Sequence, residues 1–104
     1  MSTKSATDTI QRVQPRTDIE PPKNFKVIYL NDEITTMEFV IQSLIDVFDY
    51  EFDDATHVCQ QVHEEGSSVV AVLPYELAEH KGIEVTSMAR ENNFPLQVKL
   101  EPED

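Results

Sequence analysis

The chain has 104 residues, with 20 acidic and 8 basic side chains, so its formal net charge at pH 7 is −12 when histidine is neutral. Nucleic acid and anionic membrane surfaces are poor partners for a protein with a field of this sign. The single cysteine, Cys59, excludes an intramolecular disulfide framework and favours a reducing compartment, and no apolar run is long enough to span a membrane. We therefore expect a cytoplasmic protein with one small core.

Residues 1–22 form a distinct first segment, because their polar composition carries no helical or strand period. The segment ends at Pro21-Pro22, which holds the backbone extended and cannot continue a helix. The sequence therefore predicts a flexible N-terminal extension over residues 1–22 and a single folded domain over residues 23–104.

The folded domain is predicted to open with a strand over Asn24–Leu30, followed by a helix over about 36–49. Thr35 with Glu38 three residues later has the pattern of a capping box. The strand places three apolar side chains on one side: Phe25, Val27 and Tyr29. The helix carries apolar residues at helical spacing: Met37, Val40, Ile41, Leu44 and Phe48.

A second helix is predicted to begin at an Asp53 cap and to end at Gly66, which can take a left-handed conformation. One face of this helix is apolar and consists of Ala55, Val58, Cys59 and Val62. The next segment, Ser68–Leu73, is apolar on both faces and predicts a strand.

Pro74 opens a third helix over about Tyr75–Asn92, and the alternating segment Leu96–Leu100 predicts a last strand. The order is then strand, helix, helix, strand, helix, strand. This order predicts an α+β fold in which three helices pack on a small three-stranded antiparallel sheet.

Four acceptor-bearing side chains adjoin these apolar faces. Asn31, Asp32 and Glu33 follow the first strand, and His63 lies near the end of the second helix. Together they can receive a cation with an apolar substituent. Taken singly, the three loop residues are also typical of a turn before a helix. A histidine near the C-terminal end of a helix, such as His63, is likewise typical of a partner for the helix dipole. Met37 and Val40 would be core residues by default.

Cys59 and His63 lie four residues apart on a helix, which also allows half of a metal site or a thiolate–imidazole pair. Zinc would need two further ligands, and the sequence does not place His57 or His80 as such. A cysteine hydrolase would need an oxyanion hole, which few glycines are available to shape. We therefore expect a protein without enzymatic activity, metal or cofactor.

The same residues occur in four spaced motifs that resemble those of the ClpS family, over about Pro22 to Glu101. The motifs are Val27-Ile28-Tyr29-Leu30-Asn31-Asp32-Glu33 with Thr35 and Met37-Glu38-Phe39-Val40, then Val62-His63 with Gly66, then Ala78-Glu79 with Lys81, and finally Ala89-Arg90-Glu91-Asn92 with Pro95-Leu96. The resemblance implies an adaptor that delivers N-degron substrates to the ClpA or ClpC unfoldase of the Clp protease. Its substrates would carry a free N-terminal Phe, Tyr, Trp or Leu.

The resemblance also implies which residues act. Asn31, Glu33 and His63 match the family's positions for the substrate α-ammonium, with Asp32 and Thr35 lining the same loop. A hydrophobic pocket for the first side chain is implied at Met37, Val40, Cys59, Val62 and Leu96. Docking on the unfoldase is implied for Glu76, Glu79 and Lys81, and the N-terminal extension is placed at the unfoldase pore.

Two positions depart from the family pattern. Glu33 replaces the usual Asp, so its contact with the ammonium is direct, mediated by water or shared with Asp32. Cys59 replaces a frequent Met, so we expect a roomier pocket that favours Phe, Tyr or Trp over Leu. Met37 is retained, and we expect it to exclude the β-branched Val and Ile. The alternative interpretation is a docking regulator or inhibitor of the unfoldase that does not recognise N-termini. In either case we expect a monomer.

Overall fold

A three-stranded antiparallel sheet forms the centre of the computed structural model, which describes residues 23–104. The strands are β1 (Asn24–Leu30), β2 (Ser67–Pro74) and β3 (Gln97–Pro102), and β1 lies between the other two. The predicted order of elements and the predicted α+β fold are confirmed. The extension predicted over residues 1–22 lies outside the described residues.

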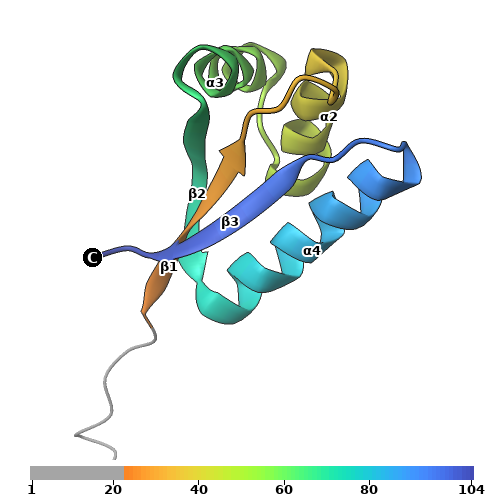
Figure 1. The fold of residues 1–104 in the computed structure, drawn as a ribbon. Coiled ribbons are helices and arrows are strands. Elements are labelled where there is room, and N and C mark those ends of the chain that lie inside the picture. Colours follow the sequence, from red (N-terminus) through yellow and green to blue (C-terminus); the bar gives the residue numbers. More distant parts are fainter. Residues whose placement is uncertain (1–22) are drawn as a thin grey trace, which may run out of the picture.

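Three helices pack on this sheet: α2 (Met37–Phe48), α3 (Phe52–Glu65) and α4 (Tyr75–Glu91). Figure 1 shows α2 and α3 grouped near the end of the sheet where β1 stops and β2 starts, whereas α4 runs alongside the strands. None of the helices in the described part of the chain is both long and apolar enough to cross a membrane.

The core lies between the helices and the face of β1 that carries Val27 and Tyr29, which are both fully buried. Phe25, on the same face, is partly buried and packs against this core. The Ser43 hydroxyl lies 2.8 Å from the Tyr29 hydroxyl and donates to the Val40 carbonyl, also at 2.8 Å. This buried chain of hydrogen bonds fixes α2 on the central strand.

Helix α2 begins one residue later than expected, so the predicted capping box was wrong. Its N-cap is Thr36, whose Oγ1 accepts a hydrogen bond from the Phe39 N–H at 3.2 Å. The Thr35 hydroxyl instead donates to Asp32 in the preceding loop. The helix ends at Phe48, before Asp49 in the left-handed region.

The predicted Asp53 cap of the second helix was also wrong. Helix α3 begins at Phe52 with Glu51 at its N-cap, without a capping hydrogen bond from a side chain, so Asp53 lies in the first turn. Its end was predicted correctly, because Gly66 closes the helix with φ of 90°.

Strand β2 is not apolar on two buried faces, as its sequence indicated. It is an edge strand, and Val69 and Val72 are exposed on the sheet face opposite Val27 and Tyr29. The pairing register of β1 with β2 shifts at Val70, whose carbonyl accepts from the Tyr50 hydroxyl at 2.6 Å.

Candidate functional site

A groove of about 720 Å³ lies between the β1–α2 loop and the facing sides of α2 and α3. All five polar residues expected at the α-ammonium site line it: Asn31, Asp32, Glu33, Thr35 and His63. So do four of the five expected pocket residues: Met37, Val40, Cys59 and Val62. Residues from two separate segments, 31–40 and 59–63, are thus brought to one hollow.

Leu96 is the exception among the expected pocket residues. It does not line the groove, because its side chain is buried in the core just before β3. The Arg90 guanidinium donates to the carbonyls of Phe94 and Leu96, at 2.8 and 2.9 Å, and holds this turn in place. In the described structure Leu96 is a core residue outside the groove lining, and its role at the first side chain stays a prediction.

The loop at the mouth is shaped by Asp32. One carboxylate oxygen of Asp32 accepts from the Ile34 and Thr35 backbone N–H groups at 2.8 and 2.7 Å, and the other accepts from the Thr35 hydroxyl at 2.8 Å. Burial alone would raise the pKa of Asp32, but the hydrogen bonds from Thr35 and Ile34 outweigh it, and with the charge of Arg90 they lower that pKa. Asp32 is therefore held as a carboxylate by its own loop.

A backbone contact fixes this loop against α3. The Asn31 N–H donates to the Gly66 carbonyl at 2.9 Å, so the residue after β1 and the residue after α3 are joined. Gly66 adopts a positive φ that side chains rarely tolerate, which permits the chain to turn there. This contact explains why His63, near the end of α3, lies beside Asn31.

The side chains of Asn31, Glu33 and His63 are exposed and form no hydrogen bond with another residue of 23–104. Asn31 offers an amide oxygen, Glu33 a carboxylate, and a neutral His63 one ring nitrogen as acceptors. Such a set can receive several N–H donors from one cationic group. Glu33, rather than the internally bonded Asp32, is the free carboxylate of the loop.

The floor of the groove is apolar. Val40, Cys59 and Val62 are buried, whereas Met37 is 43% exposed. The Cys59 thiol lies 3.7 Å from the Met37 carbonyl. Burial raises the pKa of the Cys59 thiol, and the charge of Glu38 raises it further, so the sulfur stays protonated and does not resemble an activated nucleophile.

Four further lining residues were not anticipated from the sequence as site residues: Ile34, Thr36, Glu38 and Ile41. Ile34 is 63% exposed, which is unusual for a large aliphatic side chain beside an apolar floor. Its position in the loop between Asn31 and the start of α2 was the signal that could have identified it. Among residues 23–104, no three His, Cys, Asp or Glu side chains are grouped so that they could hold a metal ion.

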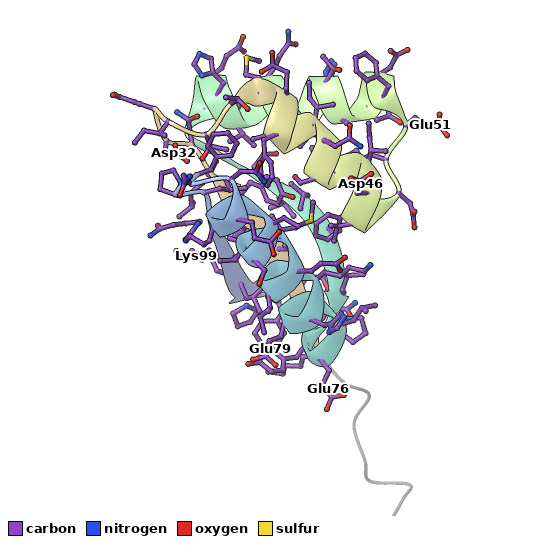
Figure 2. All side chains as sticks on the ribbon, turned by 90° about the vertical axis from the view of Figure 1, so that its right-hand side faces the viewer. Asp32, Asp46, Glu51, Glu76, Glu79 and Lys99 are labelled. Carbon is purple, nitrogen blue, oxygen red and sulfur yellow. The ribbon has the colours of Figure 1, made fainter. Side chains whose placement is uncertain are left out.

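The three expected docking residues lie on α4 and differ in their surroundings. Glu76 and Glu79 are exposed, and Glu79 accepts a hydrogen bond from the Tyr75 hydroxyl at 3.1 Å. Lys81 is instead turned toward α2, where its Nζ donates to the Val47 carbonyl at 2.8 Å and lies 5.8 Å from the Phe48 ring centre. Figure 2 shows Glu76 and Glu79 at the end of the molecule opposite Asp32.

Comparison with known proteins identifies this arrangement. The model of the family described as the ATP-dependent Clp protease adaptor protein ClpS matches residues 20–99. The chain belongs to the ClpS family. ClpS proteins are adaptors of the Clp protease, so the chain has a role in protein degradation by that protease.

Individual ClpS proteins are similar over most of their length. The adapter of Acetivibrio thermocellus is 44% identical, covering 91% of this chain and 96% of its own. That of Wolinella succinogenes is 43% identical, covering 80% and 81% of the two chains. The solved structure of Agrobacterium tumefaciens ClpS2 bound to L-phenylalaninamide is 41% identical in sequence and has a TM-score of 0.78. The match covers 80% of this chain and 100% of the ClpS2 chain.

Proposed function

We propose that this ClpS-family chain binds proteins with a free N-terminal Phe, Tyr, Trp or Leu and delivers them to the ClpA or ClpC unfoldase. The groove carries the proposal, because it places unpaired acceptors of three side chains above an apolar floor. An N-terminal residue of this kind presents an α-ammonium with only donors and an apolar side chain. L-phenylalaninamide, the ligand of the similar ClpS2 structure, has both features.

The expected affinity follows from a few terms. Burial of a Leu or Phe side chain contributes about 1.5–3 kcal/mol. Each hydrogen bond to a charged group contributes about 1.5–3 kcal/mol, whereas association itself costs several kcal/mol. We expect dissociation constants near the micromolar range, which corresponds to a favourable binding free energy of about 8 kcal/mol. This range suits an adaptor that must release its substrate.

The first test is a fluorescence anisotropy titration with peptides that differ only at the N-terminus. Peptides beginning with Phe and Leu are expected to bind, and acetylated Phe is expected to fail because its nitrogen is uncharged and has lost two donors. Ala should bind weakly because it fills little of the groove. Ile should bind weakly if Met37 excludes β-branched residues. Equal binding of Phe and acetyl-Phe peptides would contradict the proposal.

The histidine in the groove has a matched control on the same helix. His63→Ala is expected to weaken binding of Phe peptides at least about tenfold, which corresponds to about 1.4 kcal/mol for the loss of an acceptor. His57→Ala makes the same chemical change on α3 outside the groove lining and should leave affinity unchanged. Equal affinities of the two variants would remove His63 from the site.

For docking on the unfoldase we propose the start of α4, with Glu76 and Glu79 as direct contacts. Lys81 would act there by holding α4 against the end of α2, which its bond to Val47 supports. We expect the protein to work as a monomer in the cytoplasm. If no N-terminal residue binds, a docking regulator of the unfoldase becomes the better interpretation, since docking does not require the groove.

A further inference from the structure

A second groove, which we call the α4–β3 groove, has a volume of about 460 Å³ and lies between α4 and the edge strand β3 (Figure 1). Gly82, Val98 and Leu100 form its apolar floor, and Ile83 beside them is 59% exposed. A Cβ atom at Gly82 would lie 3.6 Å from the Val98 side chain, so α4 and β3 are close together at the floor. Val98 and Leu100 are only partly buried although they pack against the core. The α4–β3 groove is therefore an apolar surface that the folded domain leaves accessible.

Acidic side chains flank this floor along α4. Glu79, near the start of α4, and Glu91, its last residue, both line the groove and are exposed. Neither forms an ion pair with another residue of 23–104. Arg90 also lines the groove, but its guanidinium already donates to two backbone carbonyls of the turn after α4. The groove therefore suits an occupant that has apolar side chains and a positive net charge.

The N-terminal extension has this composition. Residues 1–22 contain three basic and three acidic side chains, so residues 23–104 carry the whole net charge of −12. All three basic residues precede residue 17, whereas two of the three acids follow it. The segment Thr9–Arg16 has no acid and carries two aliphatic residues and two arginines: Ile10, Arg12, Val13 and Arg16.

The extension joins the domain beside the same groove. The Asn24 carbonyl, at the start of β1, accepts from the Glu103 N–H just after β3, at 3.0 Å. The Phe25 ring lies 5.0 Å from the ring of Tyr75, the first residue of α4, and the Tyr75 hydroxyl donates to Glu79. The extension therefore enters the domain about one helical turn from the acid at the near end of the groove.

The length of the extension matches the length of the groove. Glu79 and Glu91 are twelve residues apart on α4, or about 18 Å along its axis. Residues 17–22 can extend over about 20 Å, and the eight residues Thr9–Arg16 over about 26 Å. The segment can therefore reach the groove and run from one acid to the other.

We propose that Thr9–Arg16 docks in the α4–β3 groove of its own chain, with its two aliphatic residues on the apolar floor and its two arginines beside Glu79 and Glu91. A short tether provides an effective concentration of about 1 mM, so a contact with a dissociation constant of about 0.1 mM keeps the docked form about tenfold in excess. A second copy of the chain is a poorer occupant, because two domains that each carry a charge of −12 repel one another.

The docked segment covers Glu79, one of the residues proposed to contact the unfoldase. Docking of the segment and docking on the unfoldase therefore compete, and the extension is released when the domain engages the unfoldase. This consequence rests on the proposed function, whereas the contact within the chain does not.

Limited trypsin digestion of the full chain tests the contact. Cleavage after Arg12 and Arg16 requires the free form, so docking slows both by about tenfold. Cleavage after Lys4, outside the docked segment, serves as the reference within the same chain. Relative to it, Ile83→Gln is expected to accelerate the two cleavages at least about fivefold. Ile34→Gln makes the same change at an isoleucine of similar exposure, 63%, outside the α4–β3 groove and should have no effect. Equal relative rates in the wild type and both variants would overturn the proposal.

A charge-only pair of variants gives a second, independent result. Glu79→Gln combined with Glu91→Gln should accelerate the same cleavages, and added salt should do so in the wild type. Glu64→Gln combined with Glu84→Gln removes two exposed acids outside the groove lining and should leave the relative rates unchanged. Equal acceleration by both double variants would assign the attraction to net charge and contradict the groove.

The competition with the unfoldase has its own measurement. Replacing Ile10 and Val13 by Gln weakens docking of the segment without altering the domain, so this variant is expected to bind the unfoldase up to about tenfold tighter than the wild type. Equal or weaker binding, with the wild type still protected from trypsin, would refute the competition and leave the contact established. If neither protein binds the unfoldase, the proposed docking fails, while the digestion still decides the contact.

Discussion

Cys59 sets the depth of the groove, because it is only 2% exposed and lies at the floor between Val40 and Val62. Replacing Cys59 by Met adds volume that can extend only toward the groove or strain the core. Cys59→Met is therefore expected to weaken binding of Phe, Tyr and Trp peptides more than that of Leu peptides. The measurement is the ratio of Phe to Leu affinities by anisotropy titration.

Cys59→Ser supplies the control for this substitution, since it keeps the size of the side chain and should keep the ratio. A ratio that stays constant in Cys59→Met would show that the aromatic ring does not reach this part of the floor. The stability of Cys59→Met should also be measured by urea unfolding, because overpacking of the core lowers the free energy of unfolding by about 1–3 kcal/mol.

Asp32 couples the shape of the loop to pH. Because hydrogen bonds from Thr35 and Ile34 lower its pKa in the folded protein, the charged carboxylate stabilises the native state. This contribution is present above the ordinary unfolded value of about 3.9 and is lost as the pH falls through the lower folded value. Asp32→Asn is expected to reduce stability by about 1 kcal/mol at neutral pH, as for a lost capping carboxylate.

Urea unfolding of the wild type and of Asp32→Asn between neutral pH and about pH 3 tests this linkage. The two curves should approach one another only on the acid side. A difference in stability that does not depend on pH would mean that the charge of Asp32 is not what holds the loop. Weaker binding of Phe peptides by the variant is expected at neutral pH, because the loop carries Glu33.

Helices α2 and α4 share the apolar core, and a charged hydrogen bond from Lys81 to the Val47 carbonyl also joins them. Lys81→Met keeps the aliphatic stem over Phe48 but removes the donor, so we expect a loss of about 1.5 kcal/mol in the free energy of unfolding. Lys99→Met changes an exposed lysine on β3 and should have a much smaller effect. Similar losses in both variants would show that the Lys81 bond contributes little.

The strands and helices were largely predictable because their apolar periods are strong, whereas their ends were decided by side chains that compete. Thr35 and Thr36 both had the right chemistry for a cap, and the hydrogen bonds of Thr35 to Asp32 left Thr36 to cap α2. Glu51 caps α3 without a side-chain bond, a position that composition cannot mark. The exposure of Val69 follows from the edge position of β2, which depends on pairing between distant segments.

The candidate site was predictable to the extent that neighbours in sequence remain neighbours in space. Asn31 and Glu33 belong to one loop, and helical spacing joins Cys59 to His63. Leu96 does not line the groove, and its buried position depends on the turn that Arg90 holds after α4, which spacing in the sequence does not indicate. Glu38 was assigned only to a helix cap, and its place at the mouth became evident once the start of α2 was known.

The proposed recognition and docking sites are far apart, since the groove around Asp32 and the exposed acids at the start of α4 lie at opposite ends of the described structure (Figure 2). Under the proposed function, this separation would allow the adaptor to hold a substrate while it is bound to the unfoldase. It also makes the two activities separable by mutation, because distant sites act nearly independently. Glu76 and Glu79 can therefore be changed without disturbing the lining of the groove.

Removal of residues 1–18 tests the same separation for the N-terminal extension. Every groove-lining residue falls within 31–63, so the truncated protein should bind Phe peptides within about twofold of the full chain. Delivery should be lost, because the resemblance to ClpS places the extension at the unfoldase pore. Degradation of a reporter with N-terminal Phe by the unfoldase and its protease measures delivery, and anisotropy measures binding. Unchanged degradation would show that the groove and α4 suffice, whereas loss of peptide binding would show that the extension supports the groove.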